Sequence, residues 1–229
     1  MIRVDDIKKI AVLGAGAMGH GIAMVALTAG YNVVLRDIKQ EFVDKGVKAM
    51  REEFEKFYVS KGKLTKEELN KMMNEQLSTA VDMKDAVSGI DFAIEAVPEI
   101  MKIKKEVFKD LDKYAPKNAI LASNTSMMSI TEIAKATNRP DKVVGMHWFN
   151  PPTMMKLVEV IKGERTSENT MKVTWDLVEK LGKVPVRVNR DVPGFIANRI
   201  TSPSGALMGA ILDQKVADPE AIDALLMSV

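Results

Sequence analysis

The 229-residue sequence contains no cysteine and only two histidines, His20 and His147. The absence of cysteine excludes disulfide bonds, zinc-thiolate sites and thiol nucleophiles. With only two imidazoles available, a multi-histidine metal centre is not expected either. We therefore predict an active site without a metal ion.

The sequence also lacks a large excess of either charge and has no long apolar run. The 33 Lys and Arg nearly balance the 31 Asp and Glu, and no basic block or aromatic-basic pattern indicates a nucleic-acid partner. No stretch approaches the roughly 18 uninterrupted apolar residues of a membrane span. The charged N-terminal Met-Ile-Arg-Val-Asp-Asp leaves no room for the apolar core of a secretory signal. We expect a soluble, cytoplasmic protein that has no membrane partner.

The chain is rich enough in apolar residues, at 46%, to bury one large domain and part of another. Its clearest motif is Gly14-Ala15-Gly16-Ala17-Met18-Gly19, which follows a short apolar run and precedes apolar residues at helical spacing. This pattern predicts a strand, a tight turn and a helix. The first glycine permits the bend, the second lets the backbone approach a pyrophosphate, and the third allows close helix packing. All six residues are predicted to contact a dinucleotide at the helix N-terminus.

The next predicted strand, residues 31–36, ends at Asp37. An acid at this position can accept hydrogen bonds from a ribose 2′-hydroxyl and would repel a 2′-phosphate, which favours NAD over NADP. Arg36 and Lys39 leave NADP open, because a nearby cation could receive that phosphate. A solvated acid at a strand end is the alternative interpretation of Asp37.

Further apolar segments alternate with helical patterns along the chain. Strands are predicted at 77–81, 90–97, 119–122, 143–146, 155–161 and 184–188, the last near a sheet edge because it contains a proline. The alternation is typical of an α/β, Rossmann-like, doubly wound and mainly parallel sheet. A helical pair that begins at residue 41 and includes a capping box at residues 65–68 forms an insertion. Its basic face could meet a phosphorylated ligand or be an ordinary solvated face.

The segment Asp191-Val192-Pro193-Gly194-Phe195 marks a predicted boundary. Everything beyond it has a helical pattern: residues 196–201, a Ser-Pro-Ser-Gly interruption, residues 206–212, and a last helix opened by Asp218-Pro219. We expect a nucleotide-binding domain over residues 1–190. Residues 191–229 would begin an all-helical domain for substrate binding and dimerisation.

Four polar segments are candidates for a site. Glu99 follows the strand 90–97, and the carboxyl ends of strands bind ligands in doubly wound sheets. Ser123-Asn124-Thr125-Ser126 follows another strand, with a plain loop as the alternative interpretation. His147 lies between a strand and a proline-stiffened turn, whereas His20 is expected to be structural. Glu159 is in the middle of an apolar strand, and a buried acid is costly unless paired, with an imidazole as its natural partner.

Five motifs occur in an order that resembles the 3-hydroxyacyl-CoA dehydrogenases of the short-chain 3-hydroxybutyryl-CoA type. They are the glycine turn, Ser-Asn-Thr-Ser, Gly-Met-His-Trp-Phe-Asn-Pro, Met-Lys-Leu-Val-Glu-Val-Ile and Asp-Val-Pro-Gly-Phe-Ile-Ala-Asn-Arg, and together they cover nearly the whole chain. The resemblance implies reversible, NAD-dependent oxidation of (S)-3-hydroxyacyl-CoA to 3-oxoacyl-CoA in fatty acid metabolism. It also implies a homodimer for the full-length protein.

The resemblance implies a role for each motif residue. His147 would be the general acid/base, Glu159 would orient it, and Ser126 and Asn198 would hold the substrate oxygen. The NAD site would include Asp37, Glu99, Lys104, Ser126 and Asn150. Hydride loss from a secondary alcohol needs a base for the hydroxyl proton, and imidazole, with a reference pKa of about 6.5, suits that task near neutral pH.

Two departures from the family matter. Members of the family continue through a glycine- and proline-rich stretch into further helices, and this chain ends before that stretch. We therefore expect a fragment, or the front of a longer, multifunctional hydratase/dehydrogenase. Where relatives carry a serine and a lysine for CoA, this chain has Glu53 and an approximately placed Lys61, the predicted CoA contact. An NAD-binding module without catalysis stays open. So does a different hydroxyacid dehydrogenase, although its catalytic-lysine motif is not found.

Overall fold

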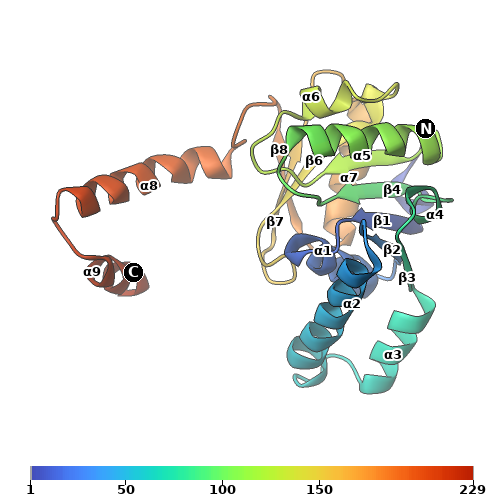
Figure 1. Ribbon diagram of the computed structural model, residues 1–229, viewed down its shortest axis with the longest axis horizontal. Helices are drawn as coiled ribbons and strands as arrows, with labels where there is room; N and C mark the ends of the chain where they lie inside the picture. The colour runs from blue at the N-terminus through green and yellow to red at the C-terminus, as the bar shows by residue number, and fades with distance from the viewer. Residues whose placement is uncertain (1, 229) are drawn as a thin grey trace.

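Residues 2–228, which the computed structural model describes, contain an eight-stranded sheet with the order β3-β2-β1-β4-β5-β6-β7-β8 (Figure 1). The strands are β1 (Lys9–Leu13), β2 (Asn32–Arg36), β3 (Leu77–Ala80), β4 (Phe92–Glu95), β5 (Ile120–Ser123), β6 (Val143–Trp148), β7 (Leu157–Ile161) and β8 (Val184–Val188). Neighbouring strands are parallel, except that β6 and β7 are antiparallel. The predicted doubly wound, mainly parallel sheet is confirmed.

Helices cover both faces of the sheet (Figure 1). They are α1 (Ala17–Thr28), α2 (Gln40–Phe54), α3 (Lys66–Glu75), α4 (Met83–Ala86), α5 (Met101–Tyr114), α6 (Ile130–Ala134), α7 (Glu168–Lys180), α8 (Ala197–Asp213) and α9 (Pro219–Ser228). Alternate residues of β1 belong to two separate apolar clusters, because successive side chains of a strand point to opposite faces. One cluster contains residues of α1, α2, α3 and α7, and the other contains residues of α4, α5 and α6.

The central strands are buried on both faces, which explains their nearly continuous apolar sequences. All residues of β4, β5 and β6 are buried, whereas β3 and β8, at the two ends of the strand order, are partly exposed. The predicted edge position of the proline-containing strand is therefore confirmed. The prediction that the strand from Val143 ends at Met146 is wrong, because pairing with β7 extends β6 through Trp148.

The predicted helical pair consists of α2 and α3, which project below the sheet in Figure 1. The predicted capping box is present, since the Thr65 and Glu68 side chains each accept a hydrogen bond from the other residue's backbone N–H. The apolar stripe of the first helix, from Glu41 to Tyr58, predicts a helix over that whole range. Instead α2 ends at Phe54 and continues into a π-helical turn, Glu55–Val59.

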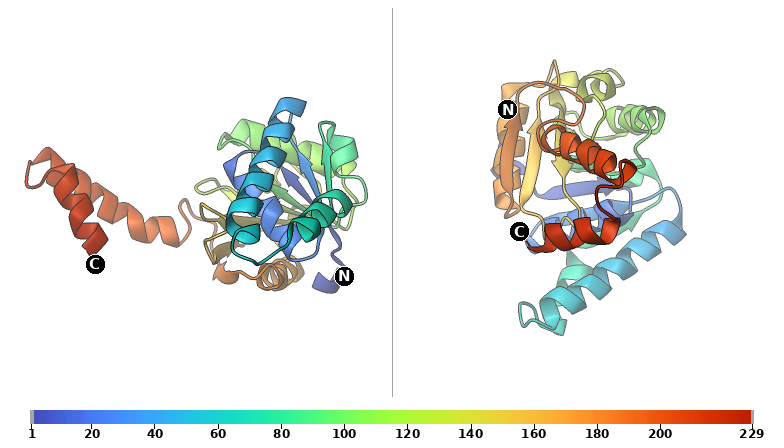
Figure 2. Two further views of the ribbon diagram at one scale, coloured as in Figure 1. Left: turned by 90° about the horizontal axis from the view of Figure 1, so that it is seen from below. Right: turned by 90° about the vertical axis from the view of Figure 1, so that its left-hand side faces the viewer.

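The C-terminal helices α8 and α9 extend away from the sheet (Figures 1 and 2). The predicted break at Ser202-Pro203-Ser204-Gly205 is wrong, because α8 is continuous and contains Pro203. Every residue of α8 is at least partly exposed, so water can bond to the carbonyl that the proline leaves without its N–H donor. Within residues 2–228, no helix combines the length and apolar character needed to cross a bilayer.

A buried ion pair closes the end of α5. The Arg139 Nε lies 2.9 Å from the Asp112 Oδ1, and the same guanidinium donates to the carbonyls of Leu111, Asp112 and Ala115. Both side chains are buried. Burial would raise the pKa of Asp112, but hydrogen bonds from Asn138 and Arg139 outweigh it, and the pKa is lowered from 3.8.

We expect Arg139→Met to lower the free energy of unfolding at pH 7 by about 3 kcal/mol, because it leaves Asp112 as a buried charge without its partner. A carboxyl group with a lowered pKa stabilises the fold above its ordinary value and loses that contribution as pH falls through the folded value. The wild type should therefore lose stability below pH 3.8 and the variant should lose less. Urea unfolding at several pH values measures both effects. Lys172→Ala, which removes the exposed pair with Asp176, is the control, and an equal response of the two variants would contradict the prediction.

Candidate active site

The glycine turn between β1 and α1 has the shape that a pyrophosphate needs. Gly14 has a φ of +107°, and a Cβ there would lie 2.5 Å from the Ala96 carbonyl oxygen. A Cβ on Gly19 would lie 1.7 Å from the Gly14 carbonyl oxygen, so helix and turn are in close contact. Apart from its own neighbours along the chain, nothing in the described part of the chain lies within 4 Å of a Cβ built on Gly16, which leaves its backbone open to a ligand. Each predicted role of the three glycines thus has a geometric counterpart.

The position of this turn in the sheet also fits a dinucleotide. From β1, the strand order continues through β2 to β3 on one side and starts at β4 on the other, so β1 and β4 form the topological switch point. Ligands bind there, at the carboxyl ends of the strands. Asp37 follows β2, and its Oδ2 accepts a hydrogen bond of 2.7 Å from the N–H of Ala15. Its carboxylate therefore lies beside the turn, where the predicted ribose contact requires it.

A buried network lies at the end of β4, and its central residue, Glu95, was not identified from the sequence. Glu95 is fully buried and accepts hydrogen bonds from the Ser123 hydroxyl at 2.6 Å and from the Lys104 amine at 2.7 Å. The only sequence signal was an acid at the end of an apolar strand. Lys104 is 1% exposed and its Nζ also lies 3.1 Å from Glu99. Its predicted contact with NAD stays a prediction, since the amine faces two carboxylates here.

Glu99 connects this network to the polar loop after β5. It accepts hydrogen bonds from the Thr125 hydroxyl and from the N–H groups of Ser126, at 2.9 Å, and Met127. Burial would raise the pKa of Glu99, but the hydrogen bonds from Thr125 and Ser126 and the charge of Lys104 lower it. The carboxylate is thereby kept ionised and fixes the loop that carries Ser126.

His147 and Glu159 lie opposite each other on the antiparallel strands β6 and β7. The His147 Nδ1 is 2.7 Å from the Glu159 Oε2, and both residues are buried, at 4% and 1% exposure. The expectation that the acid in this strand pairs with an imidazole therefore has its geometric counterpart. If Nδ1 carries the proton that Glu159 accepts, Nε2 retains a lone pair for proton exchange.

Hydrogen bonding sets the charge of Glu159. Burial would raise its pKa, but hydrogen bonds from His147 and from the backbone N–H groups of Ala197 and Ile196 outweigh burial, and the pKa is lowered. Glu159 is therefore ionised at neutral pH. An ionised carboxylate on Nδ1 holds one imidazole tautomer and stabilises the imidazolium that forms when Nε2 takes a proton.

Ser126 and Asn198 come together although 72 positions separate them in the chain. The Asn198 Nδ2 lies 3.4 Å from the Ser126 carbonyl oxygen, which brings the start of α8 to the loop after β5. Asn150 is exposed and lies two residues beyond the end of β6. The segment after β6 also packs on α1, since a Cβ on Gly21 would lie 3.0 Å from the Cδ of Pro152. These contacts bring the β6 loop close to the helix of the glycine turn.

The helical pair is attached to the glycine turn through His20. Its Nδ1 is 2.9 Å from the Gly16 carbonyl oxygen and its Nε2 is 3.0 Å from the Glu53 Oε1. This contact gives a structural partner to Glu53, the residue at the position where the resemblance implied a serine for CoA. Lys61 lies beyond the π-helical turn, is exposed, and has its amine 5.6 Å from the centre of the Phe57 ring. Its predicted CoA contact stays a prediction.

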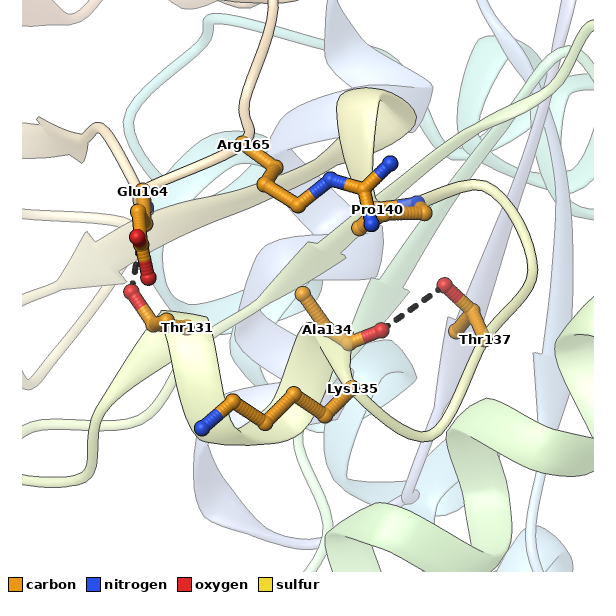
Figure 3. Close-up of a pocket in the computed structure, with 7 residues that line it drawn as sticks. All are labelled: Thr131, Ala134, Lys135, Thr137, Pro140, Glu164 and Arg165. Carbon is orange, nitrogen blue, oxygen red and sulfur yellow. Dashed lines mark hydrogen bonds between the residues drawn. The ribbon is translucent and has the colours of Figure 1, made fainter.

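A hollow elsewhere on the surface holds none of the predicted site residues. Figure 3 shows it between α6, the segment around Pro140 and the loop after β7. Its lining residues are Thr131, Ala134, Lys135, Thr137, Pro140, Glu164 and Arg165. A second hollow lies between α2 and the loop after β6, lined by Glu52, Glu53, Lys56, Phe57, Pro151, Thr153 and Met154. Only the second adjoins the contact between His20 and Glu53.

Comparisons with known proteins identify the family of this chain. Residues 9–192 match the family described as 3-hydroxyacyl-CoA dehydrogenase, NAD binding domain. The chain is 44% identical to a probable 3-hydroxybutyryl-CoA dehydrogenase of Bacillus subtilis, over 96% of this chain and 76% of that protein. It is 42% identical to a fatty acid oxidation complex subunit alpha of Idiomarina loihiensis, over 92% of this chain and 29% of that protein.

A solved structure has the same fold. The crystal structure of (S)-3-hydroxybutyryl-CoA dehydrogenase from Ralstonia eutropha superposes with a TM-score of 0.88 at 36% identity, covering 94% of this chain and 75% of that one. The family match, the relatives and the shared fold all point to one assignment. The chain therefore belongs to the 3-hydroxyacyl-CoA dehydrogenase family and contains its NAD-binding domain.

Proposed function

We propose that this protein catalyses the reversible, NAD-dependent oxidation of short-chain (S)-3-hydroxyacyl-CoA to 3-oxoacyl-CoA. The observation that carries the proposal is the buried pair of His147 and Glu159. His147 is near the carboxyl end of β6, and the glycine turn follows the carboxyl end of β1, which points the same way. Relatives named 3-hydroxybutyryl-CoA dehydrogenase support the substrate class. The cytoplasmic location expected from the sequence stays a prediction.

In the proposed mechanism, His147 Nε2 accepts the proton of the substrate 3-hydroxyl, and Glu159 stabilises the resulting imidazolium. Ser126, in the loop after β5, and Asn198, at the start of α8, hold the substrate oxygen where these two segments meet. NAD, when bound, supplies the hydride acceptor. The glycine turn, Asp37, Glu99 and Asn150 would hold it, with Lys104 supporting Glu99.

The hollow between α2 and the loop after β6 is the proposed entrance for the CoA moiety. Its lining combines the apolar faces of Phe57 and Met154 with the amine-bearing Lys56. Lys61 lies on the same helical pair. The lining also contains Glu52 and Glu53, so the positive charge for a phosphorylated thioester carrier comes from Lys56 and from Lys61 outside the hollow, while Phe57 and Met154 supply apolar contact.

We also infer that the protein forms a homodimer through its C-terminal helices. Large apolar side chains of α8 and α9 are exposed in the single chain: Ile200, Leu207, Leu212, Leu225, Leu226 and Met227. A high density of exposed large apolar side chains on two helices favours an interaction surface. Asn198 belongs to α8, so pairing of this helix would support the proposed substrate site.

Removing the imidazole tests the proposed function. We expect His147→Gln to lower kcat for reduction of acetoacetyl-CoA by NADH by about 100-fold or more, because the proton donor is lost. NADH binding should stay within about threefold, since His147 is not part of the glycine turn. Fluorescence titration with NADH measures binding on the same sample. A variant that keeps its turnover within a few-fold would contradict the assignment, and a wild type that binds NADH without turnover would favour the non-catalytic module.

The protonation state of the base predicts a pH dependence. The rate of alcohol oxidation should fall as pH drops from 8 to 5, because only neutral imidazole accepts the hydroxyl proton. Glu159 does not limit this range, since its lowered pKa keeps it ionised across it. Steady-state oxidation rates between pH 5 and 8, with a deuterated substrate to establish that chemistry is rate-limiting, measure the effect. A flat profile with chemistry limiting would contradict the prediction.

A further inference from the structure

We propose that Asp191 is a positioning residue for the pair of His147 and Glu159. It fixes the linker of residues 191–197, which ends in the first residue of α8, so that the linker's backbone donates to the carboxylate behind the imidazole. The catalytic consequence rests on the proposed function, whereas the effect on the imidazole itself does not.

Asp191 attaches the start of the linker to the start of α6. Its Oδ2 accepts hydrogen bonds from the Ser129 hydroxyl at 2.6 Å and from the N–H of Thr131 at 2.7 Å. Its Oδ1 accepts a third, at 3.1 Å, from the N–H of Ile130. One carboxylate thus holds the linker through three donors on a separate element.

The middle of the linker has a backbone conformation that needs support. Gly194 and Phe195 both have positive φ, at 78° and 48°, and a positive φ is uncommon for a residue with a bulky side chain. Phe195 is 2% exposed, and its ring centre lies 5.7 Å from that of His147. Such conformations persist where the surrounding structure holds them in place. The linker therefore packs directly on the proposed base.

The end of the linker completes the hydrogen bonding of Glu159. Its Oε1 accepts from the N–H groups of Ile196, at 2.9 Å, and Ala197, at 3.0 Å, while its Oε2 faces His147. The two carboxylate oxygens are thus divided between the linker and the imidazole. If the linker detached, Oε1 would lose both donors in a buried place and the carboxylate could rotate away from Nδ1.

The scarcity of histidine gives a direct test that does not need turnover. With only His20 and His147 in the chain, ¹⁵N-histidine NMR resolves each ring, and the shift of each nitrogen reports whether it carries a proton. In the wild type with neutral imidazoles, we expect His147 as the single Nδ1–H tautomer, because Glu159 faces Nδ1. In Asp191→Ala we expect a mixture of both tautomers, with the His20 signals unchanged. The kcat should fall by about tenfold while the KM for NADH stays within about twofold.

Ser129→Ala is the matched control. It removes one donor to Asp191 and the hydroxyl that accepts from the N–H of Glu132, but it leaves both backbone donors to Asp191 in place. We expect its His147 signals to match the wild type. If Asp191→Ala does not fold, Asp191→Asn replaces it, because the amide keeps the shape and one acceptor oxygen. A folded Asp191 variant with the wild-type tautomer, or an equal effect of Ser129→Ala, would overturn the proposal. If the wild type showed no turnover, the proposed function would be refuted, but the role of Asp191 in fixing the tautomer would not.

Discussion

A carboxylate buried in a sheet must find hydrogen-bond donors for both oxygens, and Glu159 satisfies this requirement by joining three parts of the chain. One oxygen faces the His147 ring across the antiparallel β6–β7 pair, and the other accepts two N–H groups from the linker to α8. An unpaired charge at this depth would cost several kcal/mol. The strand register, the imidazole and the docking of the linker are therefore mutually dependent.

Glu95 plays a comparable part at the other side of the site. Its oxygens accept from Lys104 and Ser123, and Lys104 in turn faces Glu99, which fixes the loop of Ser126. The two carboxylate-centred networks meet where Asn198, at the start of α8, approaches the Ser126 carbonyl. The residues proposed to hold the substrate oxygen are thus positioned from both sides by buried charge.

The sequence predicted those parts of the site that depend on local backbone rules or on the cost of burial. The glycine turn follows from conformation and close approach, and the pairing of Glu159 with an imidazole follows because an acid inside an apolar strand needs a partner and the chain offers only two. Glu95 could not be identified, since its partners come from later segments and the apolar pattern around it indicates only a strand. The burial of Lys104 is equally non-local. Pro203 was misleading because a proline breaks a helix less readily where water can reach the free carbonyl.

Replacing the carboxylate by its amide tests the central claim most directly. Glu159→Gln keeps the shape of the side chain but removes the charge that holds the Nδ1–H tautomer and stabilises the imidazolium. The account predicts an unchanged fold and NADH affinity with kcat lowered by about 100-fold or more, as expected when a base loses its orienting carboxylate. A Glu159→Gln protein that folds, binds NADH and turns over acetoacetyl-CoA within about twofold of the wild type would contradict it.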